Sequence, residues 1–179
     1  YEIGGVIDIK HTLQLFNYDL THCSPDWCVK ETGAVYNRIY YIYDGKVTYE
    51  SNNQEIELKK GNLYLFPIHR PYYIKHDQEH PLHCLWFHVA HFPPVLNKFT
   101  EINIKKTSSL FHIIKTLEEL VEEKDKQGKE KHIIIQTLEL LFSLLSSAIK
   151  FKYENDDRIK KVLKYIRDNY DSNITNSKL

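Results

Sequence analysis

The chain has 179 residues, of which 42% are hydrophobic and 27% charged, and 24 basic side chains balance 24 acidic ones. This length and composition predict a folded chain of one to one and a half domains and exclude a disordered one. The neutral balance argues against a nucleic-acid-binding surface in these residues, because such surfaces carry a cationic excess. No apolar run reaches the length that spans a bilayer and no secretory signal begins the chain, so we expect a cytoplasmic protein without membrane contact.

Residues 1 to about 100 are typical of an antiparallel β structure. Tyr, Phe, Ile and Val are interrupted at short intervals by Gly, Pro, Asn and Asp, and no helical pattern separates the runs. Two tight-turn signals, Asp44 with Gly45 and Asn52 with Asn53, are expected to join strands into hairpins. The predicted strands cover residues 12–19, 38–43, 46–51, 54–58, 63–66, 72–76 and 83–89.

Residues 108–152 are predicted to be helical. A first helix begins at Ser108 or Ser109 and ends before the charged run 122–131, and a second covers 133–149. The second helix is apolar on more than one face, so it should be buried on two sides. One side can pack within the chain, and the other is expected to meet a second copy in a homodimer, with a wholly intramolecular core as the alternative. The predicted dimer residues are Ile134, Leu138, Leu141, Leu145 and Ile149.

The last residues, RIKKVLKYIRDNYDSNITNSKL (158–179), combine an amphipathic helix with turn formers and the start of another helix. They resemble the beginning of the helix-turn-helix domain of the AraC/XylS family of bacterial transcription regulators. The segments YIYDG (41–45), LKKGNLYLFP (58–67) and WFHV (86–89) resemble the sensor domain of the same family. The resemblance implies an α+β chain with three parts: an arm and antiparallel cupin-like β-barrel (1–105), a helical dimerisation region (106–153), and a linker with a truncated helix-turn-helix domain (154–179).

The resemblance also implies a function. A small-molecule effector in the barrel would control DNA binding by a C-terminal domain that continues past Leu179. The expected partners are the effector, promoter DNA through that domain, and a second copy of the chain, with RNA polymerase as a further candidate. The alternative is a stand-alone cupin enzyme that acts on a sugar or a small acid.

Many cupins hold a metal ion on two His and a Glu, followed by a later His. Here the segment ETGAVYNRIYYIYDG (31–45) contains no His, and Tyr72 occupies the later position. We therefore expect no metal, no other cofactor and no catalytic residue. Weaker metal candidates are the set His22, Cys23 and Cys28 and the histidines between His80 and His91, although His83 and His88 should face opposite ways in a strand. The three cysteines are expected to be reduced.

The remaining possibility is a small-molecule pocket inside the barrel, with apolar walls and a few polar groups. A sugar suits such a site, because aromatic rings cover its C–H faces and polar tips bond its hydroxyls. The AraC pattern implies that Trp86 points inward, and strand alternation then places Cys84 and His88 on its face. On the strand 38–43, either Arg38, Tyr40 and Ile42 or Ile39, Tyr41 and Tyr43 line the cavity. The ligand-binding candidates are Trp86, His88, Arg38, Tyr40, Tyr72, Ile74 and Cys84, with core packing as the alternative for most aromatic residues.

Overall fold

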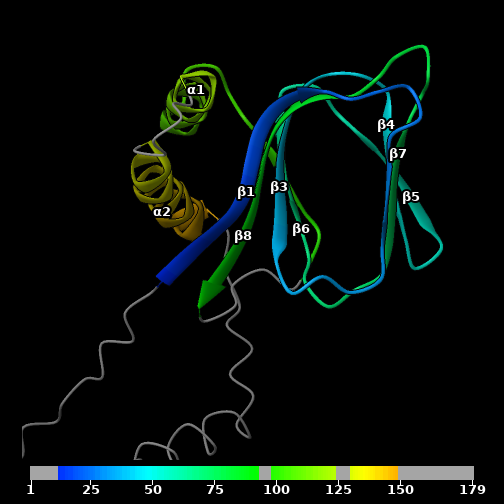
Figure 1. Cartoon of the computed structure of the whole chain (residues 1–179), viewed down its shortest axis with the longest axis horizontal. Coiled ribbons are helices and arrows are strands. Elements are labelled where there is room, and N and C mark those ends of the chain that lie inside the picture. The colour runs from blue at the N-terminus through cyan, green and yellow to red at the C-terminus, as the bar shows by residue number, and fades with distance from the viewer. Residues whose placement is uncertain (1–11, 93–97, 124–129, 149–179) are drawn as a thin grey trace, which may run out of the picture.

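The computed structural model describes residues 12–92, 98–123 and 130–148. In these ranges the strands form two antiparallel sheets that face each other (Figure 1). The five-stranded sheet has the order β1-β8-β3-β6-β9, made of Thr12–His22, His83–Phe92, Asn37–Asp44, Asn62–Phe66 and Thr100–Asn103. The four-stranded sheet has the order β2-β7-β4-β5, made of Cys28–Glu31, Tyr72–His76, Val47–Ser51 and Gln54–Leu58.

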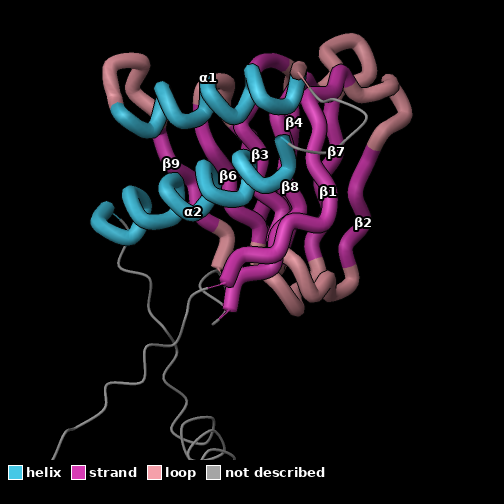
Figure 2. The backbone as a smooth tube through the Cα atoms, turned by 60° about the vertical axis from the view of Figure 1, so that its left-hand side comes forward, coloured by secondary structure: helices cyan, strands magenta, loops and turns pink. Residues whose placement is uncertain are grey.

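Two helices cover the outer face of the five-stranded sheet, so that the molecule has three layers (Figure 2). Helix α1 spans Ser109–Glu122 and α2 spans Glu130–Ala148. The side chain of Ser108 accepts a hydrogen bond from the backbone N–H of Phe111, which confirms the first of the two predicted caps. No helix in the described part of the chain is long and apolar enough to cross a membrane.

The five-stranded sheet is the middle layer, and a hydrophobic core lies on each of its two faces. Ile39 and Tyr41 of β3 pack in the core shared with the helices, whereas Tyr40 and Ile42 pack in the core between the sheets. Alternate residues of a strand point to opposite faces, so a strand in a middle layer must be apolar on both. This explains the nearly continuous apolar run of β3, and it selects Arg38, Tyr40 and Ile42 as the set that faces the interior of the sandwich.

The predicted barrel is in fact a two-sheet sandwich, and one predicted hairpin is wrong. Asn52 and Asn53 adopt the positive φ angles of 50° and 61° that a tight hairpin turn requires, and they join β4 to β5 as expected. The turn at Gly45, with φ of 110°, instead carries the chain from one sheet to the other. A Cβ at Gly45 would lie 2.6 Å from the carbonyl oxygen of Pro81, so the backbone packing at this corner admits only glycine.

Two strands were not predicted from the sequence. Strand β2 pairs with β7, with Val29 opposite Ile74, and β9 pairs with β6. Both are four-residue edge strands whose side chains alternate between exposed and half-buried positions, so polar residues dominate them. Strand β1 also continues three residues beyond the predicted end, to His22.

The predicted dimer residues of α2 lie inside the single chain. Ile134, Leu138, Leu141 and Leu145 are 0–1% exposed, because one broad face of the helix packs on both the sheet and α1. These four residues are therefore core residues, which corrects the interface assignment. Among the α2 side chains that the structure describes, the large apolar ones left exposed are Ile133, at 48%, and Leu140, at 53%. Ile149, the predicted linker and helix-turn-helix segment 154–179 and residues 1–11 of the predicted arm lie outside the described residues.

Candidate functional site

A cavity of about 390 Å³ lies between the two sheets, where β1, β3 and β8 face β2. Its volume falls in the range of about 300–1,000 Å³ that is usual for small-molecule pockets. Strand alternation provides most of its wall, and the turn after β1 closes one side. The lining residues are Thr21, His22, Cys23, Ser24, Trp27, Val29, Arg38, Tyr40, Cys84, Trp86 and His88.

Two neighbouring strands supply the central wall. In the antiparallel pairing of β3 with β8, Arg38 stands opposite His88 and Tyr40 stands opposite Trp86. The ring centroids of Trp86 and His88 are 4.7 Å apart. On the other side of β8, the indole Nε1 of Trp86 donates a hydrogen bond of 3.0 Å to Oγ1 of Thr21 in β1. The cavity thus has an aromatic wall whose polar tips are held in place by strand pairing.

Arg38 joins the two sheets through a hydrogen-bonded ion pair. Its Nη1 lies 2.5 Å from Oε2 of Glu31 in β2 and 2.8 Å from the hydroxyl of Tyr72 in β7, and Nη2 donates to the hydroxyl of Tyr36 at 3.1 Å. The side chains of Arg38 and Glu31 are only 10% and 11% exposed. Burial is the largest single effect and opposes ionisation of both groups, but their mutual hydrogen bond and the other hydrogen bonds and charges around them together outweigh it, so the pKa of Arg38 is raised and that of Glu31 is lowered.

His88 is held neutral inside the cavity. Its ring stacks on Tyr36, with centroids 4.8 Å apart, and the positive charge of Arg38 lies nearby. Burial first, and then repulsion from Arg38, lower the pKa of His88 to about 4. Burial likewise raises the pKa of Tyr40 well above 10, so its phenol stays protonated. At neutral pH the cavity therefore presents an uncharged imidazole, a phenol and a guanidinium already paired with a carboxylate.

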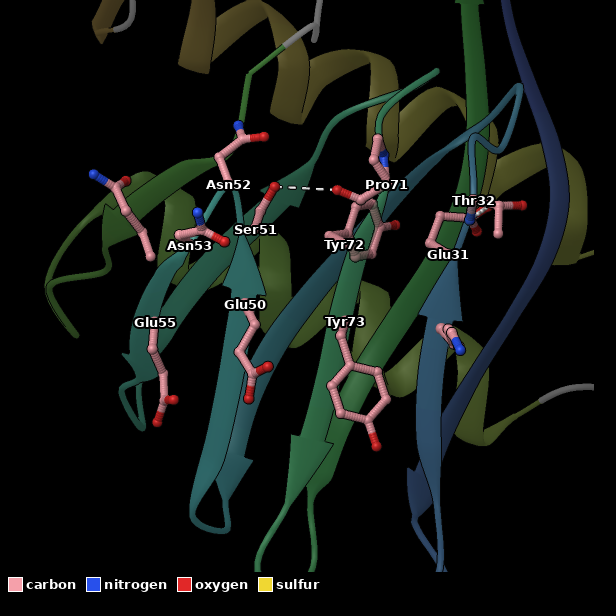
Figure 3. A pocket seen from close by; sticks show the side chains of 12 residues that line it. Glu31, Thr32, Glu50, Ser51, Asn52, Asn53, Glu55, Pro71, Tyr72 and Tyr73 are labelled. Carbon is pink, nitrogen blue, oxygen red and sulfur yellow. Dashed lines mark hydrogen bonds between the residues drawn. The ribbon is translucent and has the colours of Figure 1, made fainter.

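A second cavity, of about 570 Å³, lies at the rim of the four-stranded sheet (Figure 3). Its wall includes the exposed turn residues Asn52 and Asn53 and the exposed Gln54 at the start of β5. Glu31 and Tyr72 also line it, although both bond to Arg38 of the inner cavity. The ion pair therefore lies between the two cavities. We take the inner cavity as the candidate site, because buried aromatic walls with a few converging polar groups are characteristic of ligand pockets.

The inner cavity brings together five of the seven predicted ligand-binding residues. These are Trp86, His88, Arg38, Tyr40 and Cys84. Tyr72 lines the outer cavity and reaches the inner one only through its bond to Arg38. Ile74 is 0% exposed in the core between the sheets and lines neither of these two cavities, because its neighbours on both sheets cover it.

Sequence reasoning missed the contribution of β1, β2 and the turn between them. Thr21, Ser24, Trp27 and Val29 line the cavity, but the first strand was predicted to end before them and β2 was not predicted. A signal was present in Trp27, since a tryptophan in a short polar connection needs an apolar surface to cover it.

The weaker metal candidates do not converge. His22 and Cys23 both border the cavity, but the His22 ring stacks on His83 on the opposite face of the sheet, and the exposed Cys28 lies beside Tyr73, on the outer face of β2 and β7. His83 stacks with His22 and makes a tilted ring contact with Tyr43 on the helical side of β8, opposite to His88, as strand alternation predicted. In the described ranges, no three His, Cys, Asp or Glu side chains gather into a potential metal site.

The fold and the site define a sandwich-type ligand-binding domain with helices on one outer face. A family model of the AraC-like ligand-binding domain matches residues 23–145, more than half of the chain. The chain belongs to this family, which confirms the resemblance found in the sequence. Its fold is similar to the crystal structure of a single-residue variant of apo ToxT from Vibrio cholerae, with a TM-score of 0.53 and 10% identity over 94% of this chain and 68% of that one. No curated protein sequence matches the chain.

Proposed function

We propose that this chain is the effector-sensing part of an AraC-type transcription regulator and that its effector binds in the inner cavity. The observation that carries the proposal is the convergence of Trp86, His88, Arg38 and Tyr40 on one cavity between the sheets. Membership of the AraC-like ligand-binding family supports a regulator rather than a cupin enzyme. Promoter DNA, and RNA polymerase where it takes part, would be contacted by a C-terminal domain.

The chemistry of the cavity favours a neutral, hydroxyl-rich effector such as a sugar. Trp27 and Trp86 offer flat apolar faces for ring C–H groups, and the tips of Tyr40 and His88 offer hydrogen bonds to hydroxyls. The charge of Arg38 is already balanced by Glu31 at 2.5 Å. An acidic effector would have to compete with that carboxylate, whereas a neutral one would not.

Strand β1 offers a physical link from the cavity to the helices. Thr21 bonds to Trp86 on the cavity side. Three residues earlier, the hydroxyl of Tyr18 donates a buried hydrogen bond of 3.0 Å to Oε1 of Glu130, the first residue of α2. An effector that moves β1 would therefore act on α2, provided that it binds one arrangement better than the other.

Helix α2 is also the proposed dimer element. Ile133 and Leu140 are separated by seven residues, or two helical turns, so they share one exposed face. We propose that this face, rather than the buried leucines, meets a second copy of the chain in a two-fold dimer. The effector would then alter how the dimer presents two DNA-binding domains.

A calorimetric and thermal-shift screen tests the effector proposal. A ligand that binds the folded chain raises its melting temperature by mass action. We expect at least one neutral monosaccharide or disaccharide to stabilise the chain, and the matching uronic acid to act more weakly. If acidic or wholly apolar compounds stabilise the chain and no neutral carbohydrate does, the sugar assignment is wrong.

A further inference from the structure

Two cysteines from neighbouring strands lie side by side in the wall of the inner cavity. Strand β1 pairs antiparallel with β8, with Thr21 opposite Cys84. The pairing continues one step past the end of β1, because the backbone N–H of Cys23 donates to the carbonyl of Leu82 at 2.8 Å. Cys23 is thus the diagonal neighbour of Cys84 on the face that lines the cavity. Nothing in the proposed effector binding requires two adjacent thiols.

The two thiols differ in exposure. Cys84 is 1% exposed, whereas Cys23 is half-buried and borders the cavity. A hydrogen bond from the Cys84 thiol lowers the pKa of Cys23, against the opposing effect of partial burial. The same hydrogen bond, together with burial, raises the pKa of Cys84 well above 9.0. The pair therefore loses its first proton at Cys23, on the sulfur that the cavity exposes, and the thiolate is the reactive form of cysteine.

We propose that Cys23 and Cys84 form an oxidation site for hydroperoxides, and that the product is a disulfide in the cavity wall. The Cys23 thiolate attacks one peroxide oxygen of H₂O₂, the O–O bond breaks, and a proton completes the leaving hydroxide as water. The sulfenic acid on Cys23 is then attacked by the sulfur of Cys84, and its hydroxyl leaves as a second water with the Cys84 proton. The two cysteines together lose two electrons, and the peroxide gains them.

A disulfide between Cys23 and Cys84 requires a small movement at the end of β1. Diagonal neighbours in an antiparallel pair have Cα atoms about 7–8 Å apart, and a disulfide needs about 4.4–6.8 Å. Cys23 lies just beyond the last residue of β1 and is followed by a turn at Ser24 to Trp27, so it can approach β8 by about 1 Å. Such a shift would draw Thr21, the acceptor for Trp86, along with it. The consequence for effector binding rests on the proposed function, whereas the thiol chemistry does not.

Peptide mapping of the whole chain tests the oxidation site directly. The reduced protein is treated with hydrogen peroxide, free thiols are alkylated, and peptides are identified by mass spectrometry. We expect two of the three cysteines to be lost to alkylation as one Cys23–Cys84 disulfide, with Cys28 still alkylated and dithiothreitol restoring all three. The proposal is overturned if Cys28 is oxidised while Cys23 and Cys84 both remain reduced, or if the disulfides formed join two chains.

Single variants assign the roles of the two sulfurs. Cys28→Ser is the matched control and should leave the disulfide unchanged, because Cys28 lies on the outer face of its sheet. Cys84→Ala should leave a sulfenic acid on Cys23 that dimedone labels, whereas Cys23→Ser should leave Cys84 unlabelled. Dimedone labelling of Cys84 in the Cys23→Ser variant would contradict the assignment. If Cys84→Ala fails to fold, as judged by circular dichroism, the wild-type peptide map decides alone.

A comparison of reduced and oxidised protein separates this proposal from the effector proposal. The carbohydrate thermal-shift screen is run on both forms. If oxidation changes the shift in melting temperature that a carbohydrate produces, both proposals are supported together. Disulfide formation in a protein that responds to no carbohydrate would retain the oxidation site and reject the sugar effector.

Discussion

The indole of Trp86 is fixed to a neighbouring strand by one hydrogen bond, from Nε1 to Oγ1 of Thr21, at 3.0 Å. Trp86 belongs to β8 and Thr21 to β1, so the bond joins two strands across the wall of the inner cavity. It satisfies the only polar atom of the indole side chain and sets the plane of the ring beside His88. The ring is therefore preorganised to contact a ligand, which reduces the entropy lost on binding.

Replacement of Trp86 by Ala should abolish stabilisation by the effector. It removes the main apolar wall and leaves Thr21 without its donor, so the free energy of unfolding should fall by about 2–3 kcal/mol. Trp86→Phe is the matched control, since it keeps an aromatic face but lacks the donor, and part of the effector response should remain. Melting curves with and without carbohydrate measure both effects. A full effector response in Trp86→Ala would mean that the effector binds elsewhere.

Neutralising Glu31 should change the charge preference of the cavity. Glu31→Gln leaves Arg38 as a buried cation without its counter-ion, which should lower the free energy of unfolding by about 3 kcal/mol. The same change frees the guanidinium for an anion, so a uronic acid should now stabilise the variant more than the neutral sugar does. Lys60 and Asp44 form an exposed ion pair, and Asp44→Asn serves as the control with little effect on either measurement. An unchanged preference in Glu31→Gln would argue against Arg38 as a ligand contact.

The pKa of His88 predicts how stability depends on pH. The folded chain holds His88 near pKa 4, mainly by burial, below the value of 6.5 expected in the unfolded chain. Between these values the unfolded chain binds more protons, so the free energy of unfolding should decrease as the pH falls from about 6.5 to 4. His88→Gln should flatten this slope, whereas the same change at the exposed His112 of α1 should not. Urea denaturation at several pH values measures the slopes.

The Glu31–Arg38 pair should also make the free energy of unfolding decrease as the pH falls, but over a lower pH range than His88 does. The folded pKa of Glu31 is lowered from its ordinary 4.5, so the pair stabilises the chain above that pH. This stability is lost as the pH falls through the lowered pKa. The two contributions can be separated, because His88→Gln removes only the pH dependence at the higher pH and leaves that of Glu31.

The sequence predicted the elements whose patterns are local. The β4–β5 hairpin follows from Asn52 and Asn53, which tolerate positive φ, and the start of α1 follows from Ser108, which caps the helix. Alternation also placed Trp86 and His88 on one face of β8. These predictions hold because the determining residues are neighbours in the chain.

Features decided by distant contacts were not predictable in the same way. Asp44 with Gly45 predicts a turn, but this signal is the same whether β4 pairs with β3 in one sheet or begins the other sheet. The outcome depends on the packing of Gly45 against Pro81, which is distant in the sequence. Likewise, the sequence of α2 is apolar on several faces of the helix, but only the contacts of α2 with the sheet and α1 show that Leu141 is a core residue. The role of Glu31 was missed because it depends on Arg38 from the opposite sheet.

Removal of the Tyr18 hydroxyl should loosen the link between β1 and α2. In Tyr18→Phe the carboxylate of Glu130 loses the donor that bonds its Oε1, and Glu130 is 8% exposed. A buried acceptor without a partner should lower the free energy of unfolding by about 1–2 kcal/mol. Hydrogen exchange should show faster opening of the first turn of α2 while the β3–β8 pairing is unchanged. Uniformly faster exchange across both sheets would instead indicate a general loss of stability.

The exposed apolar face of α2 leads to the last prediction, which concerns assembly. Ile133 and Leu140 lie two turns apart on the side of the helix that faces away from the sheet, and about half of each side chain is exposed. If this face is the dimer seam, Ile133→Glu with Leu140→Glu places like charges against each other there and should split the dimer into folded monomers. Thr116→Glu, at an exposed position of α1, is the control that should leave the dimer intact. Sedimentation equilibrium measures the mass, and circular dichroism shows that the variants fold.

Because neither apolar residue is part of the core, loss of folding in the double variant is not expected, whereas Leu141→Glu should unfold the chain. A wild-type chain that remains monomeric at tens of micromolar would contradict the seam, since exposed apolar residues would then have no partner copy to cover them.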